Sequence, residues 1–199
     1  MRRNGLLLRD WRIFCLRKRF KLIIYLSIMS KYSSKTETGK CVFCEIALGN
    51  KTPQGNGKYW ESEKYIAWLS PFPNTEGFTV VIPKKHYTSD VLKMPDNELS
   101  DFIIEVKNIS KLLLEYFPNV GRIGLIMEGT GIDHAHIKLI PMHGTEHMKR
   151  NVWKQYSSNK DDYYEEYKGF LSSHDGPKAD FDKISELANK LKELKLSKL

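Results

Sequence analysis

The sequence predicts an α+β domain, because short strand patterns and amphipathic helix patterns follow one another without a regular strand–helix alternation. The 199 residues include 41% hydrophobic side chains, enough for a self-supporting core. No apolar run approaches the ~20 residues that cross a bilayer, so no transmembrane span is expected. Three cysteines are too few for a disulfide framework, which favours a reducing compartment and predicts a cytoplasmic protein.

The first residues differ in composition from the rest of the chain. The net charge is +8, but residues 1–40 hold eleven Lys and Arg against two acids, which leaves the remainder near neutrality. That near-neutral remainder argues against nucleic-acid binding. We interpret residues 1–38 as a basic leader ahead of a domain at 39–199. The leader is an organellar targeting segment, an extension before a start at Met29, a membrane-surface helix or a disordered tail without function.

Helix and strand patterns follow the leader in order. Residues 41–49 are typical of a short helix that ends at Gly49. Apolar residues spaced by three and four over 95–117 predict a long helix with one buried face, and 180–196 predict a second amphipathic helix at the C-terminal side. Runs of β-formers predict the strands, at 58–62, 64–69, 78–83, 121–127 and 134–141.

Residues 131–141 carry the most chemistry. In a strand, alternate side chains share a face, so His134, His136 and Lys138 project together. A face with two imidazoles and an ammonium attracts phosphate, and a neutral imidazole is a good nucleophile near pH 7. The alternative is an exposed edge strand whose polar face merely meets water. The residues expected to face the long helix instead are Ala135, Ile137 and Leu139.

Three segments resemble the histidine triad (HIT) family and occur in family order and at family spacing across residues 41–147. The family signature, His-φ-His-φ-His-φ-φ followed by Pro, with φ apolar, is similar to HAHIKLIP at 134–141. A strand ending in Val-Ile-Pro-Lys-x-His resembles GFTVVIPKKH at 77–86. The family opening Cys-φ-Phe-Cys-x-Ile is similar to CVFCEI at 41–46.

The resemblance implies a five-stranded antiparallel sheet with a long helix, paired as a homodimer. It further implies a nucleotide hydrolase or nucleotidyl transferase that acts at a nucleoside α-phosphate, with a covalent nucleotidyl intermediate on His136. Dinucleoside polyphosphates and nucleoside phosphoramidates are the substrate types. Lys138 stands in place of the third histidine, where its ammonium is expected to neutralise phosphate oxygens. The alternatives are a nucleotide-binding module with little or no turnover and, more remotely, a zinc-clipped protein-interaction domain.

Departures from the family pattern fall on the expected substrate contacts. Ser70 stands where the family usually has an acidic or amide residue for the ribose hydroxyls, and Phe78 replaces a histidine. Gly131 occupies the position of a Ser or Thr that commonly donates to phosphate. Ribose and phosphate binding must therefore be rebuilt, and the candidates are Ser70, Asn74, Lys84, Glu128 and Thr130.

Cys41 and Cys44 have the spacing found in zinc knuckles. A lone Cys-x-x-Cys is also compatible with two buried small hydrophobic residues or with a redox pair. Some HIT proteins bind zinc with this pair, the histidine that ends Pro-Lys-x-His and the first histidine of the triad. In this chain those histidines are His86 and His134. The resemblance therefore implies a structural zinc that clips the N-terminal helix onto the sheet.

Overall fold

A computed structural model describes residues 33–156 and 163–167 of the chain. Its contacts divide the chain into two units, Met1–Glu146 and His147–Leu199. The leader up to residue 32 and the helix predicted at 180–196 lie outside the described residues. The division into a leader and one domain at 39–199 therefore stays a prediction. Within the described part, no helix is long and apolar enough to span a membrane.

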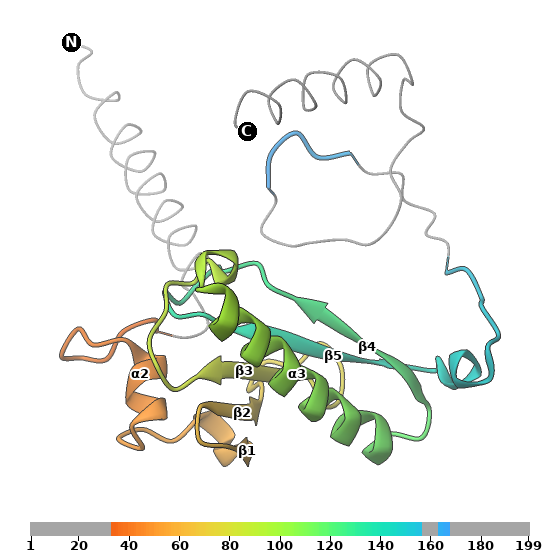
Figure 1. Ribbon diagram of the computed structural model, residues 1–199, viewed down its shortest axis with the longest axis horizontal. Coiled ribbons are helices and arrows are strands. Elements are labelled where there is room, and N and C mark those ends of the chain that lie inside the picture. Colours follow the sequence, from red (N-terminus) through yellow and green to blue (C-terminus); the bar gives the residue numbers. More distant parts are fainter. Residues whose placement is uncertain (1–32, 157–162, 168–199) are drawn as a thin grey trace, which may run out of the picture. The chain divides into compact units, whose positions relative to one another are not determined.

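The first unit contains an α+β fold, a five-stranded antiparallel sheet with helices, as the sequence predicts (Figure 1). The strands are β1 (Lys58–Glu61), β2 (Tyr65–Leu69), β3 (Thr79–Pro83), β4 (Val120–Ile126) and β5 (Ile137–His143). Its helices are α2 (Val42–Ala47) and α3 (Asp96–Tyr116), with 3-10 turns η1 (Gln54–Asn56) and η2 (Val91–Lys93). A third 3-10 turn, η3 (Glu146–Arg150), belongs to the second unit except for its first residue. The strands lie in the order β1-β2-β3-β5-β4.

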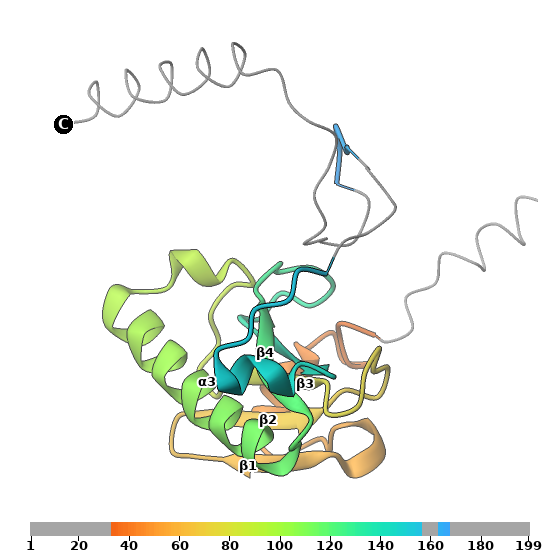
Figure 2. The ribbon, with the colours of Figure 1, turned by 90° about the vertical axis from the view of Figure 1, so that its right-hand side faces the viewer.

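Two apolar layers cover the two faces of this sheet, with α3 and α2 on opposite sides (Figure 2). The apolar stripe of α3 is buried against Ala135, Ile137 and Leu139, as predicted. The residues of α3 in that layer are Phe102, Val106, Ile109 and Leu113. On the other face, Val42, Phe43 and Ile46 of α2 pack on Ile66, Trp68 and Ile82 of β2 and β3.

The chain that carries the histidines is central in the sheet. β5 lies between β3 and β4, so this segment is not an exposed edge strand. The prediction that the strand begins at His134 is wrong, since β5 begins at Ile137. The reason is a tight turn: the His134 N–H donates to the Ile132 carbonyl, and the Ala135 N–H donates to the Tyr87 carbonyl. Successive side chains still alternate between the two faces of the sheet, so His136 and Lys138 lie on the α2 side.

Candidate active site and metal centre

A cavity of about 320 Å³ lies between α2, the loop that follows it and the sheet. Val80 of β3 pairs with Trp68 of β2 on one side and with Lys138 of β5 on the other, so the three side chains share one face. All three line the cavity, which therefore extends across three strands. Its volume lies at the lower end of the range found for small-molecule sites.

His136 lines this cavity although its residue is only 4% exposed. Its Nδ1–H donates to the His134 carbonyl oxygen at 2.7 Å. Burial lowers the pKa of the His136 imidazole, against the opposing effect of this hydrogen bond. The ring is thus neutral near pH 7, and the tautomer with a proton on Nδ1 leaves a lone pair on Nε2. This nitrogen is the one available for nucleophilic attack.

Lys138 lies on β5, two residues after His136, and forms an ion pair with Glu128. The two side chains are only 21% and 13% exposed. Burial lowers the pKa of Lys138, and the carboxylate opposite it favours the charged ammonium. The cavity therefore holds a neutral imidazole just before β5 and a cation on β5, two residues apart.

The predicted substrate residues divide into two groups. Ser70 and Thr130 line the cavity, and Glu128 adjoins it through Lys138. The Ser70 hydroxyl oxygen accepts a hydrogen bond from the Phe72 N–H at 3.2 Å. The other two residues, Asn74 and Lys84, are not in the cavity wall, and Lys84 pairs instead with Glu61 at 2.8 Å.

Several cavity residues are not among the site residues that the sequence predicts. The Phe43 ring meets Trp68 edge-on at 5.1 Å and His136 at 5.7 Å between ring centres, so it connects the apolar wall with the His136 imidazole. The sequence does indicate that Phe43 is buried, because an apolar residue between the two cysteines of a short helix is expected to pack against the core. Lys51 and Gln54 of the following loop also line the cavity, and no sequence pattern identifies them.

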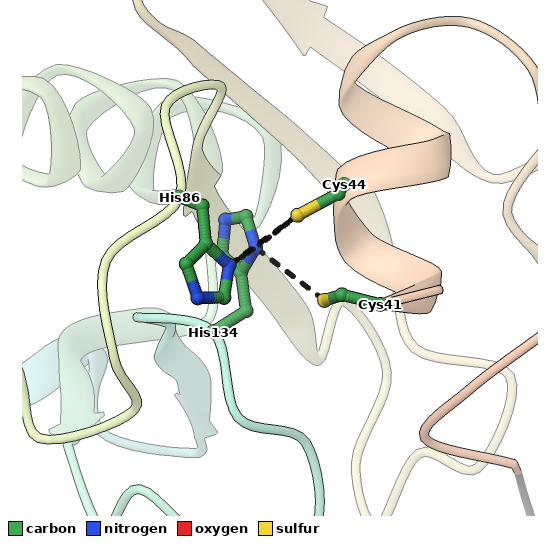
Figure 3. A group of neighbouring side chains, drawn as sticks. All are labelled: Cys41, Cys44, His86 and His134. Atoms are coloured by element: carbon green, nitrogen blue, oxygen red, sulfur yellow. Dashed lines mark hydrogen bonds between the residues drawn. The ribbon is translucent and has the colours of Figure 1, made fainter. Parts of the chain in front are cut away.

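Cys41, Cys44, His86 and His134 converge beside the cavity, from α2, the end of β3 and the turn before β5 (Figure 3). Their ligand atoms all lie within 4.8 Å of one another. The Nδ1 atoms of the two histidines are 3.3 Å apart, and the Cys44 Sγ is 3.3 Å from one and 3.5 Å from the other. The Cys41 Sγ is 3.7 Å from the His134 Nδ1.

These distances fit one tetrahedral metal ion. Bonds of about 2.0 Å to nitrogen and 2.3 Å to sulfur place neighbouring ligand atoms of a tetrahedron about 3.3 to 3.8 Å apart. The Nε2–H of His134 donates to the Pro83 carbonyl at 2.9 Å, which leaves the Nδ1 lone pair facing the sulfurs. Burial, then the neighbouring Cys41, raises the pKa of the Cys44 thiol to about 11 when no cation is bound. The cluster could thus hold a metal ion, and binding would release thiol protons.

Comparisons with known proteins agree with this fold. No family model matches the chain. An adenosine 5′-monophosphoramidase from Candida albicans is 29% identical over 165 residues, which cover 77% of this chain and 90% of that protein. The crystal structure of a histidine triad nucleotide-binding protein from Candida albicans superposes with a TM-score of 0.54 and 26% identity, over 80% of this chain and 99% of that chain.

A second relative is more similar in sequence over a shorter stretch. An uncharacterized HIT-like protein from Mycoplasma genitalium is 34% identical over 119 residues. The alignment covers 56% of this chain and 79% of that protein. Identity at this level, over most of the relative's length and on the same fold, shows that the chain belongs to the histidine triad family.

Proposed function

We propose that this protein is a nucleotide hydrolase that acts at a nucleoside α-phosphate through His136. The observation that carries the proposal is the neutral His136 imidazole, fixed by the His134 carbonyl in a cavity that also contains Lys138. Adenosine 5′-monophosphoramidases among the relatives favour a nucleoside phosphoramidate as substrate over a dinucleoside polyphosphate. The apolar side chains of Phe43 and Trp68 support binding of the base.

Two displacements at phosphorus complete the proposed reaction. The Nε2 lone pair of His136 attacks the α-phosphorus, a phosphorus–nitrogen bond forms, and the leaving group departs with its electron pair and takes a proton from water. Lys138 balances the negative charge on the phosphate oxygens. Water then attacks the phosphorus, the bond to Nε2 breaks with its electron pair returning to the imidazole, and the proton that this water loses neutralises the hydroxide left by the first displacement. The products are a nucleoside monophosphate and the free enzyme.

The variant His136→Ala tests this proposal. We expect its kcat/KM for adenosine 5′-phosphoramidate to fall at least ~10³-fold, because the covalent nucleophile is removed. The matched control is His143→Ala. The His143 imidazole of the wild type lies outside the cavity wall and bonds to Asn119 and the Glu76 carbonyl. Rapid quenching of the wild type should trap the nucleotide on His136. Equal rates for wild type and His136→Ala would overturn the proposal, and nucleotide binding without adduct or turnover would identify a binding module.

A structural zinc in the cluster of Cys41, Cys44, His86 and His134 is the second part of the proposal. Two thiolates and two imidazoles are a donor set typical of structural zinc, and four protein ligands leave no open position for substrate. The ion would supply a crosslink between α2 and the sheet. This assignment separates His134, a ligand, from His136, the nucleophile.

We also propose a homodimer that forms through β4. Among the described strands, β1 and β4 are the two edges of the sheet; β1 exposes the charged Lys58 and Glu61, whereas Leu125 of β4 is 43% exposed. An edge strand with an apolar side chain is a surface that proteins normally cover. Exposed apolar side chains on α3 add to the apolar surface, at Ile103, Ile104, Leu112 and Tyr116.

A further inference from the structure

The ion pair of Lys138 and Glu128 determines the charge beside the nucleophile. Lys138 is on β5 and pairs across the ladder with Ile126, and Glu128 follows two residues after Ile126. The ammonium lines the cavity, whereas the carboxylate reaches it only through the ammonium. Both side chains are mostly buried, so water screens their charges weakly.

The described wall of the cavity contains two lysines and no carboxylate. Lys51 is an exposed residue in a loop, so solvent screens the charge of its ammonium. His136 is neutral, as argued above. The charge felt at the position of a bound phosphate is therefore chiefly that of Lys138 and Glu128 together, and this pair has no net charge.

Substrate and product of the proposed reaction differ in charge at phosphorus. The α-phosphorus of a phosphoramidate or an anhydride carries one negative charge, whereas a nucleoside monophosphate carries nearly two above its second pKa of about 6. Compared with Lys138 alone, the ion pair attracts the dianion less, since the carboxylate behind the ammonium repels the second charge of the product. A site with Lys138 alone would instead retain the dianion.

We propose that Glu128 is a specificity-determining residue, which sets the phosphate site for monoanionic phosphorus and promotes release of the dianionic mononucleotide. This inference rests on the proposed function of the same site. Glu128 acts here through its charge, and its Oε1 also accepts a hydrogen bond from the Lys138 Nζ. Glu128→Gln keeps an acceptor oxygen for that bond and removes the charge, so it separates the two contributions.

Calorimetric titration of AMP and of uncharged adenosine tests the inference. In Glu128→Gln the Kd for AMP should fall about tenfold, with the Kd for adenosine unchanged, because only the dianion interacts with the lost charge. Inhibition of phosphoramidate hydrolysis by AMP should become stronger by a similar factor. The matched control is Glu105→Gln, which removes the same charge on the α3 side, where Glu105 accepts a bond from the Trp60 indole N–H. Its AMP affinity should stay within about twofold of the wild type.

The wild-type protein provides a test that does not depend on how a variant folds. It should bind AMP no more than tenfold more tightly than the monoanionic 5′-methylphosphate ester of adenosine. An unchanged or weaker AMP affinity in a folded Glu128→Gln, or a wild type that binds AMP more than tenfold tighter than the ester, would overturn the inference. Absence of any binding of AMP and adenosine to the wild type would instead overturn the proposed function together with it.

Discussion

The two histidines before β5 donate through opposite ring nitrogens, which agrees with the different roles proposed for them. His134 donates through Nε2 to the Pro83 carbonyl, so its Nδ1 lone pair faces the cysteine sulfurs. His136 donates through Nδ1 to the His134 carbonyl, so its lone pair is on Nε2. Each backbone carbonyl thereby fixes one tautomer. The proposed metal ligand and the proposed nucleophile can thus lie two residues apart, each with its lone pair on a different ring nitrogen.

Burial of His134 predicts a pH-dependent stability of the metal-free protein. Burial lowers the pKa of this imidazole from 6.5 to about 4. Between pH 4 and 6.5, His134 is therefore protonated in the unfolded chain and neutral in the folded chain. The stabilisation is complete above about pH 6.5 and is lost as the pH falls toward 4. In urea unfolding of chelator-treated protein, the free energy of unfolding should decrease by about 1–3 kcal/mol as the pH falls through this range. In the variant His134→Gln, the free energy of unfolding should decrease less over the same pH range. An equal decrease in both proteins would contradict the prediction.

The sequence predicts individual residues well where chemistry needs a fixed spacing and poorly where packing decides. The two cysteines and two histidines of the cluster follow from motifs, because a metal demands particular ligand types. Phe43 and Trp68 become neighbours only because α2 packs across β2, which no local pattern encodes. Lys84 is attractive as a phosphate ligand by sequence position, yet its ammonium is held by Glu61.

At the scale of elements, α2 is a short helix whose position depends on two kinds of contact. Its apolar residues Val42, Phe43 and Ile46 pack on the sheet, and the cysteines at its start meet His86 and His134. A helix of six residues has little stability of its own, so tertiary contacts must hold it. Because Phe43 contacts His136, movement of α2 would alter the cavity wall.

Loss of the metal should therefore loosen α2 more than the rest of the fold. Protein purified without added zinc should contain about one zinc per chain, and Cys44→Ser should lose most of it. Hydrogen exchange at 42–47 should then accelerate at least about tenfold, while β3 and β5 stay protected. His143→Ala is the matched control, since the His143 imidazole bonds to Asn119 and the Glu76 carbonyl instead of joining the cluster, and it should retain the metal. A wild type of full stability with no bound metal would contradict the assignment.

The elements themselves were predictable to different degrees. The long helix has a clear three-and-four spacing, and α3 is found where that spacing predicts it. The start of β5 was not predictable, because the turn at His134 depends on a hydrogen bond from Ala135 to the distant Tyr87 carbonyl. Strand order was equally inaccessible to local patterns: β5 pairs with β3, more than fifty positions earlier in the chain.

At the scale of the whole molecule, the open edge at β4 predicts a dimer in solution. Leu125 opposes Leu139, so its side chain lies on the α3 side of the sheet, next to the helix that exposes further apolar residues. Two copies related by a two-fold axis would pair their β4 strands antiparallel and cover this surface. Stable dimers usually bury about 1,200 Å² or more, so the helix surface must contribute beside the strand.

Sedimentation at micromolar concentration should therefore give the mass of two chains for the wild type. Leu125→Lys places a charge on the edge strand and should shift the protein toward the monomer, because the interface would then bury an unpaired ammonium. Leu92→Lys introduces the same charge at an exposed position of η2 and should leave the dimer intact. A monomeric wild type, or equal masses for the two variants, would show that the β4 edge is covered in some other way. Since His136 and Lys138 lie within one chain, the Leu125→Lys monomer should retain covalent capture of the nucleotide if the site is complete without the partner.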